Sequence, residues 1–527
     1  MQELNKLFAT RYRATGRIIK APLVSGGQRV SDSRVGSQLE SALTTAKDLL
    51  IGNPEYSEIP DVAGYADIED QWDKGYREML RAAILDGSCT PRHTEIVDYP
   101  KNAITFRPLA RFSARDRLIY DALVYSVGAS IDAQIRRPVY SYRWNHKSGK
   151  PRFWFGPWKR MQTEARRTLG SDKRLRMATI DVSSFYEHID VEILADDLAC
   201  VSRRGDASKN LNRFLTSFQR INHAWGLPQG SDASGVLANL YLAPVDEYLS
   251  KNKFQFLRYS DDIMIFHRDW TELRDVLSEI NKIFRARRLS MSAQKTGILE
   301  PEEAFKRIHD ARKASLSAAC DIGIPGTFVE VRQYFDEIIK GEVQDTRSLR
   351  FVINRLAKLE DDYAVSWCLD NLPFMAHVAK EVFSYLRIFT GRVDEIQRKL
   401  VNFMRSGASE SYPYLEQRIL RYFLTMGLQD ERLKESAWLI LEDRNREDFP
   451  REFASRYLGR AASVSEAQLL RHKFEEEPSV TMRRALLMSL YESKHLSRRY
   501  LRDVEEYLPQ LKWVCRFLST GPRIPVS

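Results

Sequence analysis

Long apolar runs, cysteine pairs and an acidic excess are all missing from this sequence of 527 residues. No run of about 18 apolar residues suggests a membrane span. The opening residues, MQELNKLFATRYRATGR, lack the apolar segment of a secretory signal. The five cysteines are odd in number and never spaced as CxxC, which argues against a disulfide framework and a zinc knuckle. We therefore expect a cytoplasmic protein with no membrane partner.

The charge balance is basic instead, with a formal net charge of +10. Counted along the sequence, +7 of this lies in residues 1–330 and +3 in residues 331–527. A basic excess favours an acidic partner such as nucleic acid or a membrane surface. The length alone predicts roughly two to four domains.

The pattern of apolar residues divides the chain into parts. Residues 1–100 are predicted to be helices and loops, with a helix in EDQWDKGYREMLRAAIL (69–85). Over 101–330 short β-rich runs alternate with helical stretches, which indicates an α+β fold. Beyond these, amphipathic segments recur every 15–25 residues or so and predict an all-α, repeat-like domain over 331–520, followed by a tail over 521–527.

Aspartates stand at the ends of two predicted strands. Asp181 follows an apolar strand in ATIDVSSFYEHID (178–190), and RYSDDIMIF (258–266) predicts a hairpin with Asp261 and Asp262 at its turn. A helix cap or a hydrophilic turn would explain each of them alone. However, apolar flanking strands would bury the hairpin, and a buried carboxylate pair is costly unless a cation compensates it. Carboxylates from separate strands are what two-metal phosphoryl transfer needs.

Two more segments fit the same chemistry. GLPQGSDASGVLANLYL (226–242) predicts a Gly/Pro loop and a helix, either an ordinary helix start or a loop whose backbone lies against a nascent base pair. In RLSMSAQKTGIL (288–299), Lys295 is either a solvated charge or a general acid beside a pyrophosphate leaving group. Each signal is modest alone, but the four in this order are hard to obtain by chance.

This arrangement resembles the reverse transcriptase family over about residues 100–300. IDVSSFY is similar to motif A, GLPQGSDASG to motif B, YSDD to the YxDD box of motif C, and LSMSAQKTG to motif D. The resemblance implies a right-hand polymerase with fingers and palm in residues 101–330, preceded by a helical and fingers region. It also implies DNA synthesis from dNTPs on RNA or DNA, with two Mg²⁺ ions for which Mn²⁺ can substitute. Asp181 and Asp261 would be the main metal ligands, with Asp262 and Val182 beside them.

The resemblance also implies residues that bind the incoming nucleotide. Tyr186, five residues beyond Asp181, matches the steric gate that rejects a 2′-hydroxyl, and Phe185 lies next to it. Gln229 and Gly230 belong to motif B. In ITFRPLARFSARDRLIYDAL (104–123), Arg107 matches the fingers arginine that grips the triphosphate. The remaining arginines of this segment are weaker candidates, because an arginine beside an aspartate is more often a solvated ion pair; they are Arg111, Arg115 and Arg117.

Cations alternate with aromatic residues in VYSYRWNHKSGKPRFWFGPWKR (139–160). Stacking faces together with positive charges are what a single nucleic-acid strand needs, although such aromatics can equally be core. The candidate nucleic-acid-binding residues are Arg143, Trp144, Lys150, Arg152, Trp154 and Trp158.

A looser resemblance is to the bacterial abortive-infection and defence-associated reverse transcriptases of the AbiK and AbiA type. It implies antiphage defence, homo-oligomeric assembly, and DNA synthesis primed from a protein hydroxyl, without a template or on a partner non-coding RNA. No motif establishes priming, for which Tyr12 is one candidate. The alternatives are a group II intron-like or retron-like retroelement enzyme and, in another class, an inactive nucleic-acid-binding scaffold. The intact set of Asp181, Asp261, Asp262 and Lys295 counts against the scaffold.

Overall fold

The computed structural model describes residues 29–52, 58–92, 94–201, 205–222, 224–341 and 345–526. Tyr12 therefore lies outside the described residues. The chain forms two compact units, each built from three segments. Unit 1 comprises residues 1–50, 77–94 and 112–310, and unit 2 comprises residues 51–76, 95–111 and 311–527. These units do not coincide with the boundaries that the sequence predicts at residues 100 and 330.

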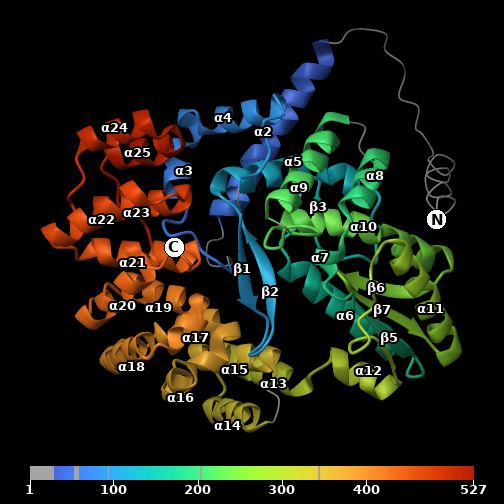
Figure 1. Cartoon of the computed structure of the whole chain (residues 1–527). Helices are drawn as coiled ribbons and strands as arrows, with labels where there is room; N and C mark the ends of the chain where they lie inside the picture. The colour runs from blue at the N-terminus through green and yellow to red at the C-terminus, as the bar shows by residue number, and fades with distance from the viewer. Residues whose placement is uncertain are drawn as a thin grey trace. The chain divides into compact units, whose positions relative to one another are not determined.

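Unit 1 combines a small sheet with surrounding helices (Figure 1). Its elements, some of which begin or end just across the unit boundary, are α2 (Arg29–Ile51), α4 (Tyr76–Leu85), α5 (Ala114–Asp132), β3 (Trp144–Asn145), β4 (Lys150–Pro151), α6 (Phe155–Ser171), β5 (Arg176–Ile180), α7 (Phe185–His188), α8 (Val191–Val201), α9 (Gly205–Asn222), α10 (Asp232–Lys251), β6 (Gln255–Tyr259), β7 (Asp262–His267), α11 (Trp270–Ala286), β8 (Gly297–Leu299) and α12 (Pro301–Ile308).

The sheet of unit 1 has the antiparallel order β6-β7-β5-β8, and helices cover both of its faces. On one face, Met177, Leu257 and Phe266 form a hydrophobic cluster with residues of α6 and α12. The residues that alternate with them, such as Ile263 and Ile265, are also buried, and α10 and α11 pack against the sheet. A sheet buried on both faces holds its strand ends rigidly, and the candidate site lies at one of these ends.

Over its described residues, unit 2 is helical except for one hairpin. Its elements are α3 (Ala66–Gln71), η2 (Trp72–Lys74), β1 (Glu95–Pro100), β2 (Phe106–Arg111), α13 (Ala311–Ile322), α14 (Thr327–Lys340), α15 (Thr346–Lys358), η3 (Asp362–Ala364), α16 (Val365–Asp370), η4 (Leu372–Val378), α17 (Ala379–Leu386), η5 (Thr390–Arg392), α18 (Val393–Arg405), η6 (Ala408–Ser411), α19 (Pro413–Met426), α20 (Glu431–Glu442), α21 (Asp448–Arg460), α22 (Val464–Glu476), α23 (Val480–Glu492), α24 (Arg498–Tyr507), η7 (Pro509–Leu511) and α25 (Lys512–Ser519).

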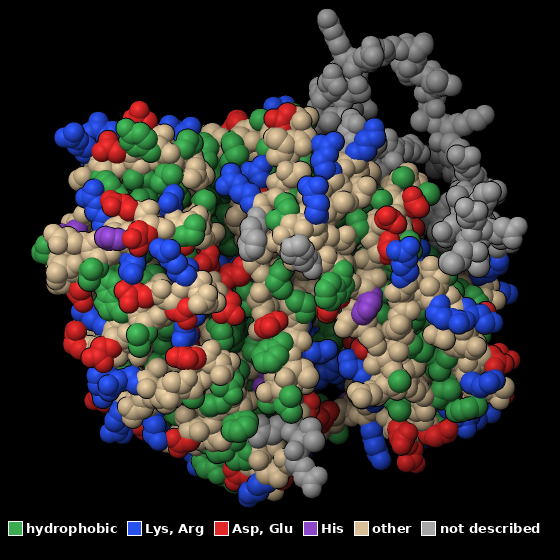
Figure 2. Space-filling model, viewed as in Figure 1, with side chains coloured by type: hydrophobic (Ala, Val, Ile, Leu, Met, Phe, Trp, Pro, Cys, Tyr) green, Lys and Arg blue, Asp and Glu red, His purple; other side chains and the backbone are tan. Residues whose placement is uncertain are grey.

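The helices of unit 2 pack in a regular succession. The odd-numbered helices from α15 to α25 each contact the next odd-numbered one, and α16, α18 and α20 do the same. Figure 2 shows Lys and Arg interspersed with Asp and Glu over α18–α24, at the left of the view, with no large area of one sign. Within the described residues, no helix is both long and apolar enough to span a membrane.

Two local expectations need correction. The helix predicted over 69–85 is interrupted, since α3, η2 and α4 replace it. Gly75 ends η2 with φ of 112°, a conformation that side chains disfavour. Residues 95–100, expected to be helix or loop, form β1 and pair antiparallel with β2, from Glu95 opposite Arg111 to Pro100 opposite Phe106. The signal for β1 is short, because it alternates buried and exposed residues over only part of its length.

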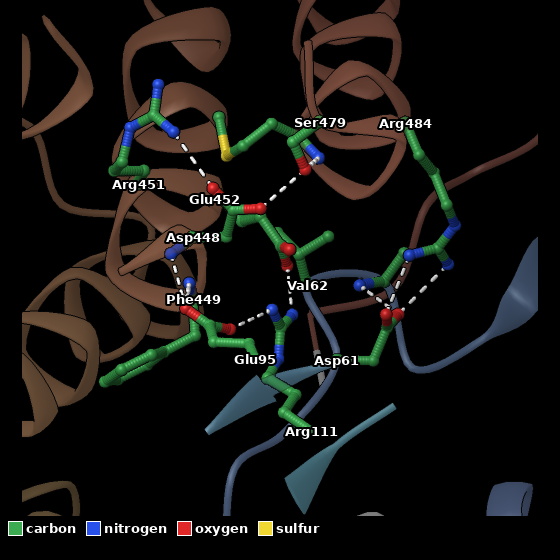
Figure 3. A network of polar contacts seen from close by, with 12 residues as sticks. Asp61, Val62, Glu95, Arg111, Asp448, Phe449, Arg451, Glu452, Ser479 and Arg484 are labelled. Atoms are coloured by element: carbon green, nitrogen blue, oxygen red, sulfur yellow. Dashed lines mark hydrogen bonds and ion pairs between the residues drawn. The ribbon is translucent and has the colours of Figure 1, made fainter. Parts of the chain in front are cut away.

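Buried ion pairs connect the early segments of unit 2 to its late helices (Figure 3). Arg111 of β2 donates from Nη1 to Glu95 (2.9 Å) and from Nη2 to Glu452 of α21 (2.6 Å). Burial raises the pKa of Glu452 to about 8, although Arg111 acts in the opposite direction. Arg484 of α23 likewise pairs with both Asp61 (2.7 Å) and Asp67 (2.6 Å). These pairs fix the hairpin and α3 against the helices.

Arg484→Ala should destabilise unit 2 strongly. The substitution leaves Asp61 and Asp67, whose side chains are only 5% and 2% exposed, without this cation. Breaking a buried pair by removing one partner costs about 3–5 kcal/mol. We expect a lower urea midpoint by circular dichroism than for Arg502→Ala, which removes an exposed arginine of α24. Equal midpoints for the two variants would contradict the importance of the buried pairs.

Candidate active site

The three candidate carboxylates stand at neighbouring strand ends. In the β6–β7 hairpin the last pair is Tyr259 opposite Asp262, so Ser260 and Asp261 form the connecting turn. Ser260 has a φ of 56°, which lets the chain reverse within two residues. Asp181 directly follows β5, whose last residue, Ile180, lies opposite Ile263 of β7. The sheet therefore brings Asp181 to the end of β5 beside the turn that carries the aspartate pair.

The electrostatics of Asp261 indicate concentrated negative charge. Burial raises its pKa to about 6, and the charges of Asp262 and Asp181 add to the effect. Oxygen ligands of this kind suit a hard divalent cation, which would relieve the repulsion. In the described part of the chain, however, no three acidic, cysteine or histidine side chains are arranged as a ready-made metal site. The donor chemistry thus fits a metal ion, while the ligating geometry is not preformed.

Lys295 lies beside Asp181. Its Nζ donates to both carboxylate oxygens of Asp181, at 3.0 and 3.2 Å. The turn that carries Lys295 is held by the Ser292 N–H, which donates to the carbonyl of Asp181 (2.8 Å). Val182 is buried and pairs in an isolated bridge with Met291 of the same segment. Motif D is therefore fixed to the backbone of motif A.

Of the two candidate gate residues, Tyr186 rather than Phe185 contacts the turn that carries Asp261. Phe185 is buried in the core, and its ring contacts that of Tyr186 at a centroid distance of 5.4 Å. The Tyr186 hydroxyl lies 3.5 Å from the Ser260 hydroxyl. Burial raises the pKa of Tyr186 to about 12, so the phenol stays protonated at neutral pH. Of the two candidates, Tyr186 is therefore the one whose side chain reaches this turn, and its role as a steric gate stays a prediction.

The Gly/Pro loop packs directly on this aromatic segment. The Leu227 N–H donates to the carbonyl of Tyr186 (2.8 Å), and a Cβ at Gly226 would lie only 2.0 Å from that oxygen. Only glycine fits there, with its φ of 70°. The Gln229 amide contacts the Glu187 carboxylate at 3.5 Å, and Gly230, with φ of 104°, turns the chain into α10.

Helix α5 holds the start of α10. Ser231 caps α10 and donates to Asp121 (2.5 Å), which in turn pairs with Arg117 (2.9 Å). Arg115 pairs with Asp116 in the same way. Both arginines therefore form ion pairs within unit 1. An ion pair is the alternative to triphosphate binding that the sequence leaves open for them.

A buried polar network lies behind the catalytic turn. Arg258 makes a two-pronged pair with Asp246 of α10, at 2.8 and 2.6 Å. It also donates to the side-chain oxygen of Asn239 and to the Ser260 carbonyl, both at 2.9 Å. Ser141 completes the set, because its hydroxyl accepts the Ser260 N–H at 2.7 Å. Both backbone groups of Ser260 are thus held by side chains, which fixes the residue before Asp261.

No sequence motif predicts this network, although the sequence contains signals for it. Arg258 follows the buried apolar residues Phe256 and Leu257 in its strand, and Asp246 lies in a helix with many buried apolar residues. A buried charge on one element requires a partner on another.

Arg107 lies in unit 2, on β2. Its guanidinium pairs with Glu58 and lies 5.1 Å from the ring centroid of Tyr99. Arg111, in the same strand, belongs to the buried ion pairs of that unit. The triphosphate-binding role of Arg107 stays a prediction.

The basic and aromatic segment divides into a structural and an exposed part. Trp144 is 5% exposed and its ring packs so closely on Gly128 that a Cβ there would lie 2.5 Å from it. Arg143 pairs with Asp132 at 2.5 Å. Trp144 is therefore part of the core, and Arg143 is held in an ion pair. The side chains of Trp154 and Trp158 are 47% and 40% exposed. Lys150 and Arg152 are exposed as well.

Comparison with known proteins supplies one family match. Residues 99–314 match the family model described as reverse transcriptase (RNA-dependent DNA polymerase). No curated protein is similar enough to count as a relative. Two similar solved structures are apo telomerase from Candida tropicalis (11% identity, TM-score 0.31, 73% of each chain covered) and telomerase from Candida albicans with the TWJ fragment of telomeric RNA (10%, 0.31, 69% of this chain and 70% of that one). Similarity at this level carries no argument about this chain.

Ser141→Ala should impair nucleotide incorporation without unfolding the protein. The substitution leaves the Ser260 N–H without its acceptor, and an unsatisfied buried group costs about 1–3 kcal/mol. Since about 1.4 kcal/mol corresponds to a factor of ten in rate, we expect a roughly tenfold or larger loss. Single-turnover incorporation kinetics would measure it. Ser126→Ala is the matched control, because the Ser126 hydroxyl donates to the Leu123 carbonyl of its own helix and the substitution leaves the Ser126 backbone carbonyl in place. Equal rates for the two variants would contradict the positioning role of Ser141.

Proposed function

We propose that this chain adds dNTPs using two Mg²⁺ ions held by Asp181, Asp261 and Asp262. Residues 99–314 match the reverse transcriptase family model, and the chain is accordingly an RNA-directed DNA polymerase. The single observation that supports this most directly is the grouping of these carboxylates at neighbouring strand ends. The raised pKa of Asp261, caused by burial and by the two other aspartates, supports a cation as their partner. Mn²⁺ should substitute for Mg²⁺, because it accepts the same oxygen ligands.

Each side chain has a distinct part in this proposal. The metal ions, when bound, activate the 3′-hydroxyl and neutralise the triphosphate. Lys295, beside Asp181, supplies a proton or a positive charge to the pyrophosphate leaving group. Tyr186 contacts the sugar and excludes a 2′-hydroxyl. Gln229 and Gly230 lie along the base pair, and Arg107 grips the triphosphate.

The finer proposal is a defence-associated polymerase of the abortive-infection type. It rests on the resemblance in motif order together with a long helical region after the polymerase motifs. Its further elements are homo-oligomeric assembly, a helical repeat array, a non-coding RNA as partner, and priming from a protein hydroxyl. A scaffold without catalysis is the alternative from another class, and an incorporation assay with each labelled dNTP separates the two.

Asp181→Ala and Asp261→Asn should each abolish dNTP incorporation. The lost group places a catalytic ion, so the rate should fall by several orders of magnitude while the fold and RNA binding persist. Gel analysis of labelled products, with circular dichroism as a check of folding, would measure both. Asp275→Asn, an exposed aspartate on α11, is the matched control. Near wild-type incorporation by either active-site variant would contradict the assignment.

Tyr186→Val should raise the use of rNTPs relative to dNTPs. Removing the ring makes space for a 2′-hydroxyl, and steric discrimination of this size is worth on the order of tenfold or more. The ratio of kcat/KM for matched rNTP and dNTP pairs is the measurement, with Tyr248→Val on α10 as control. Unchanged selectivity in Tyr186→Val and also in Phe185→Ala would refute a steric gate here.

A further inference from the structure

A pocket of about 370 Å³ lies in unit 1, beyond the carboxyl end of α5. Its apolar wall includes Val139 and Trp144, which are 2% and 5% exposed. Arg137, Arg152 and Arg160 also line it. The pocket lies within one compact unit and contains none of the aspartates of the candidate active site.

The positive charge of this pocket is not neutralised from within. Its one carboxylate, Asp132, accepts from Arg143 (2.5 Å), from the Trp144 N–H (3.0 Å) and lies 3.2 Å from His146. Arg143 thus balances Asp132. Among the residues that the structure describes, no acidic side chain pairs with Arg137, Arg152 or Arg160. Three like charges around one cavity repel one another unless an anion separates them.

The chemistry of these side chains selects the anion. An arginine guanidinium presents parallel donors that match two oxygens of a phosphate, and it stays charged at any physiological pH. The neighbouring surface adds stacking faces, since Phe153, Trp154, Phe155 and Trp158 are all 40–50% exposed. Cations that follow a backbone, next to aromatic rings that accept bases, are the usual surface for a single strand.

The pocket is joined to the catalytic hairpin through the backbone. The Tyr140 N–H donates to the Arg258 carbonyl (2.9 Å), and Val139 pairs with Arg258 in a parallel bridge. On the exposed side, the Tyr259 hydroxyl donates to the carbonyl of Trp154 (3.1 Å). A strand bound at the arginines and aromatic rings would therefore lie beside the two residues that precede the catalytic turn.

We propose that Arg137, Arg152 and Arg160 form a phosphate-binding site outside the catalytic centre. This site binds successive backbone phosphates of a single-stranded nucleic acid. The proposal deepens the polymerase function, because it assigns a place to the strand. It also gives Arg137 and Arg160 a role that the sequence motifs do not suggest.

The test is the salt dependence of binding by the full-length protein. Binding of a fluorescent single-stranded RNA is measured by anisotropy from 50 to 300 mM KCl, without dNTP or divalent metal. Each phosphate contact contributes about 0.7 to the slope of log K against log salt for single strands. The triple variant Arg137→Gln/Arg152→Gln/Arg160→Gln should therefore bind with a slope shallower by about 2.

The control carries the same change of charge elsewhere in unit 1. Arg220→Gln/Arg285→Gln/Arg307→Gln removes three exposed arginines from α9, α11 and α12. If both triple variants change the slope equally, the pocket is no specific site and the proposal is overturned. A second arm measures thermal stabilisation by dNTP alone. If the pocket variant loses this stabilisation while its RNA slope is unchanged, the ligand is a free nucleotide and the strand assignment fails.

The outcome is independent of catalysis. RNA binding is measured without dNTP and without divalent metal, so a loss of polymerase activity would not alter it. Equal unfolding temperatures of the variants and the wild-type protein exclude a folding defect as the cause. Asp261→Asn should keep the wild-type slope, and a shallower slope for that variant would contradict a site outside the catalytic centre.

Discussion

The ion pair between Arg258 and Asp246 is the interaction on which the geometry of the β6–β7 hairpin depends. Its side chains are 0% and 1% exposed, so both charges have lost their water. Such a pair adds little net stability, because its Coulombic gain is offset by desolvation. Its contribution here is to hold the guanidinium of Arg258 in a fixed orientation. The same guanidinium also donates to Asn239 and to the Ser260 carbonyl, and these contacts hold the end of the strand in place.

That rigidity matters because the groups at the strand end repel one another. Asp181, Asp261 and Asp262 are held together although burial and the charges of the other two aspartates raise the pKa of Asp261 to about 6. A flexible turn would let the carboxylates move apart. Helices on both faces of the sheet, the Ser141 hydroxyl and Lys295 all oppose that movement. Packing and hydrogen bonds from several other elements therefore keep these mutually repelling carboxylates close together.

Local signals in the sequence are enough to locate the candidate site residues, whose catalytic roles stay predictions. The YSDD turn, Asp181 and Lys295 are each recognisable within about ten residues, and the structure brings them together. Contacts between distant residues give no local signal in the sequence: Ser141 and Asn239 are 98 residues apart, and Arg111 and Glu452 are 341 apart. No periodicity reveals such pairings. Trp144 and Arg143 illustrate a third case, since composition cannot distinguish a ring that packs on Gly128 from one that stacks on a base.

The buried pairs of unit 2 also bear on the order in which the chain is made. A ribosome releases Asp61 long before Arg484, which follows 423 residues later, and Arg111 long before Glu452. Unit 1 ends at residue 310, so its segments can be complete while most of unit 2 is still unsynthesised. During that time Arg111 of the β1–β2 hairpin lacks Glu452, and Asp67 of α3 lacks Arg484. Domains generally fold as units while they emerge. Here the last helices must arrive before the earliest segments of their own unit can be buried.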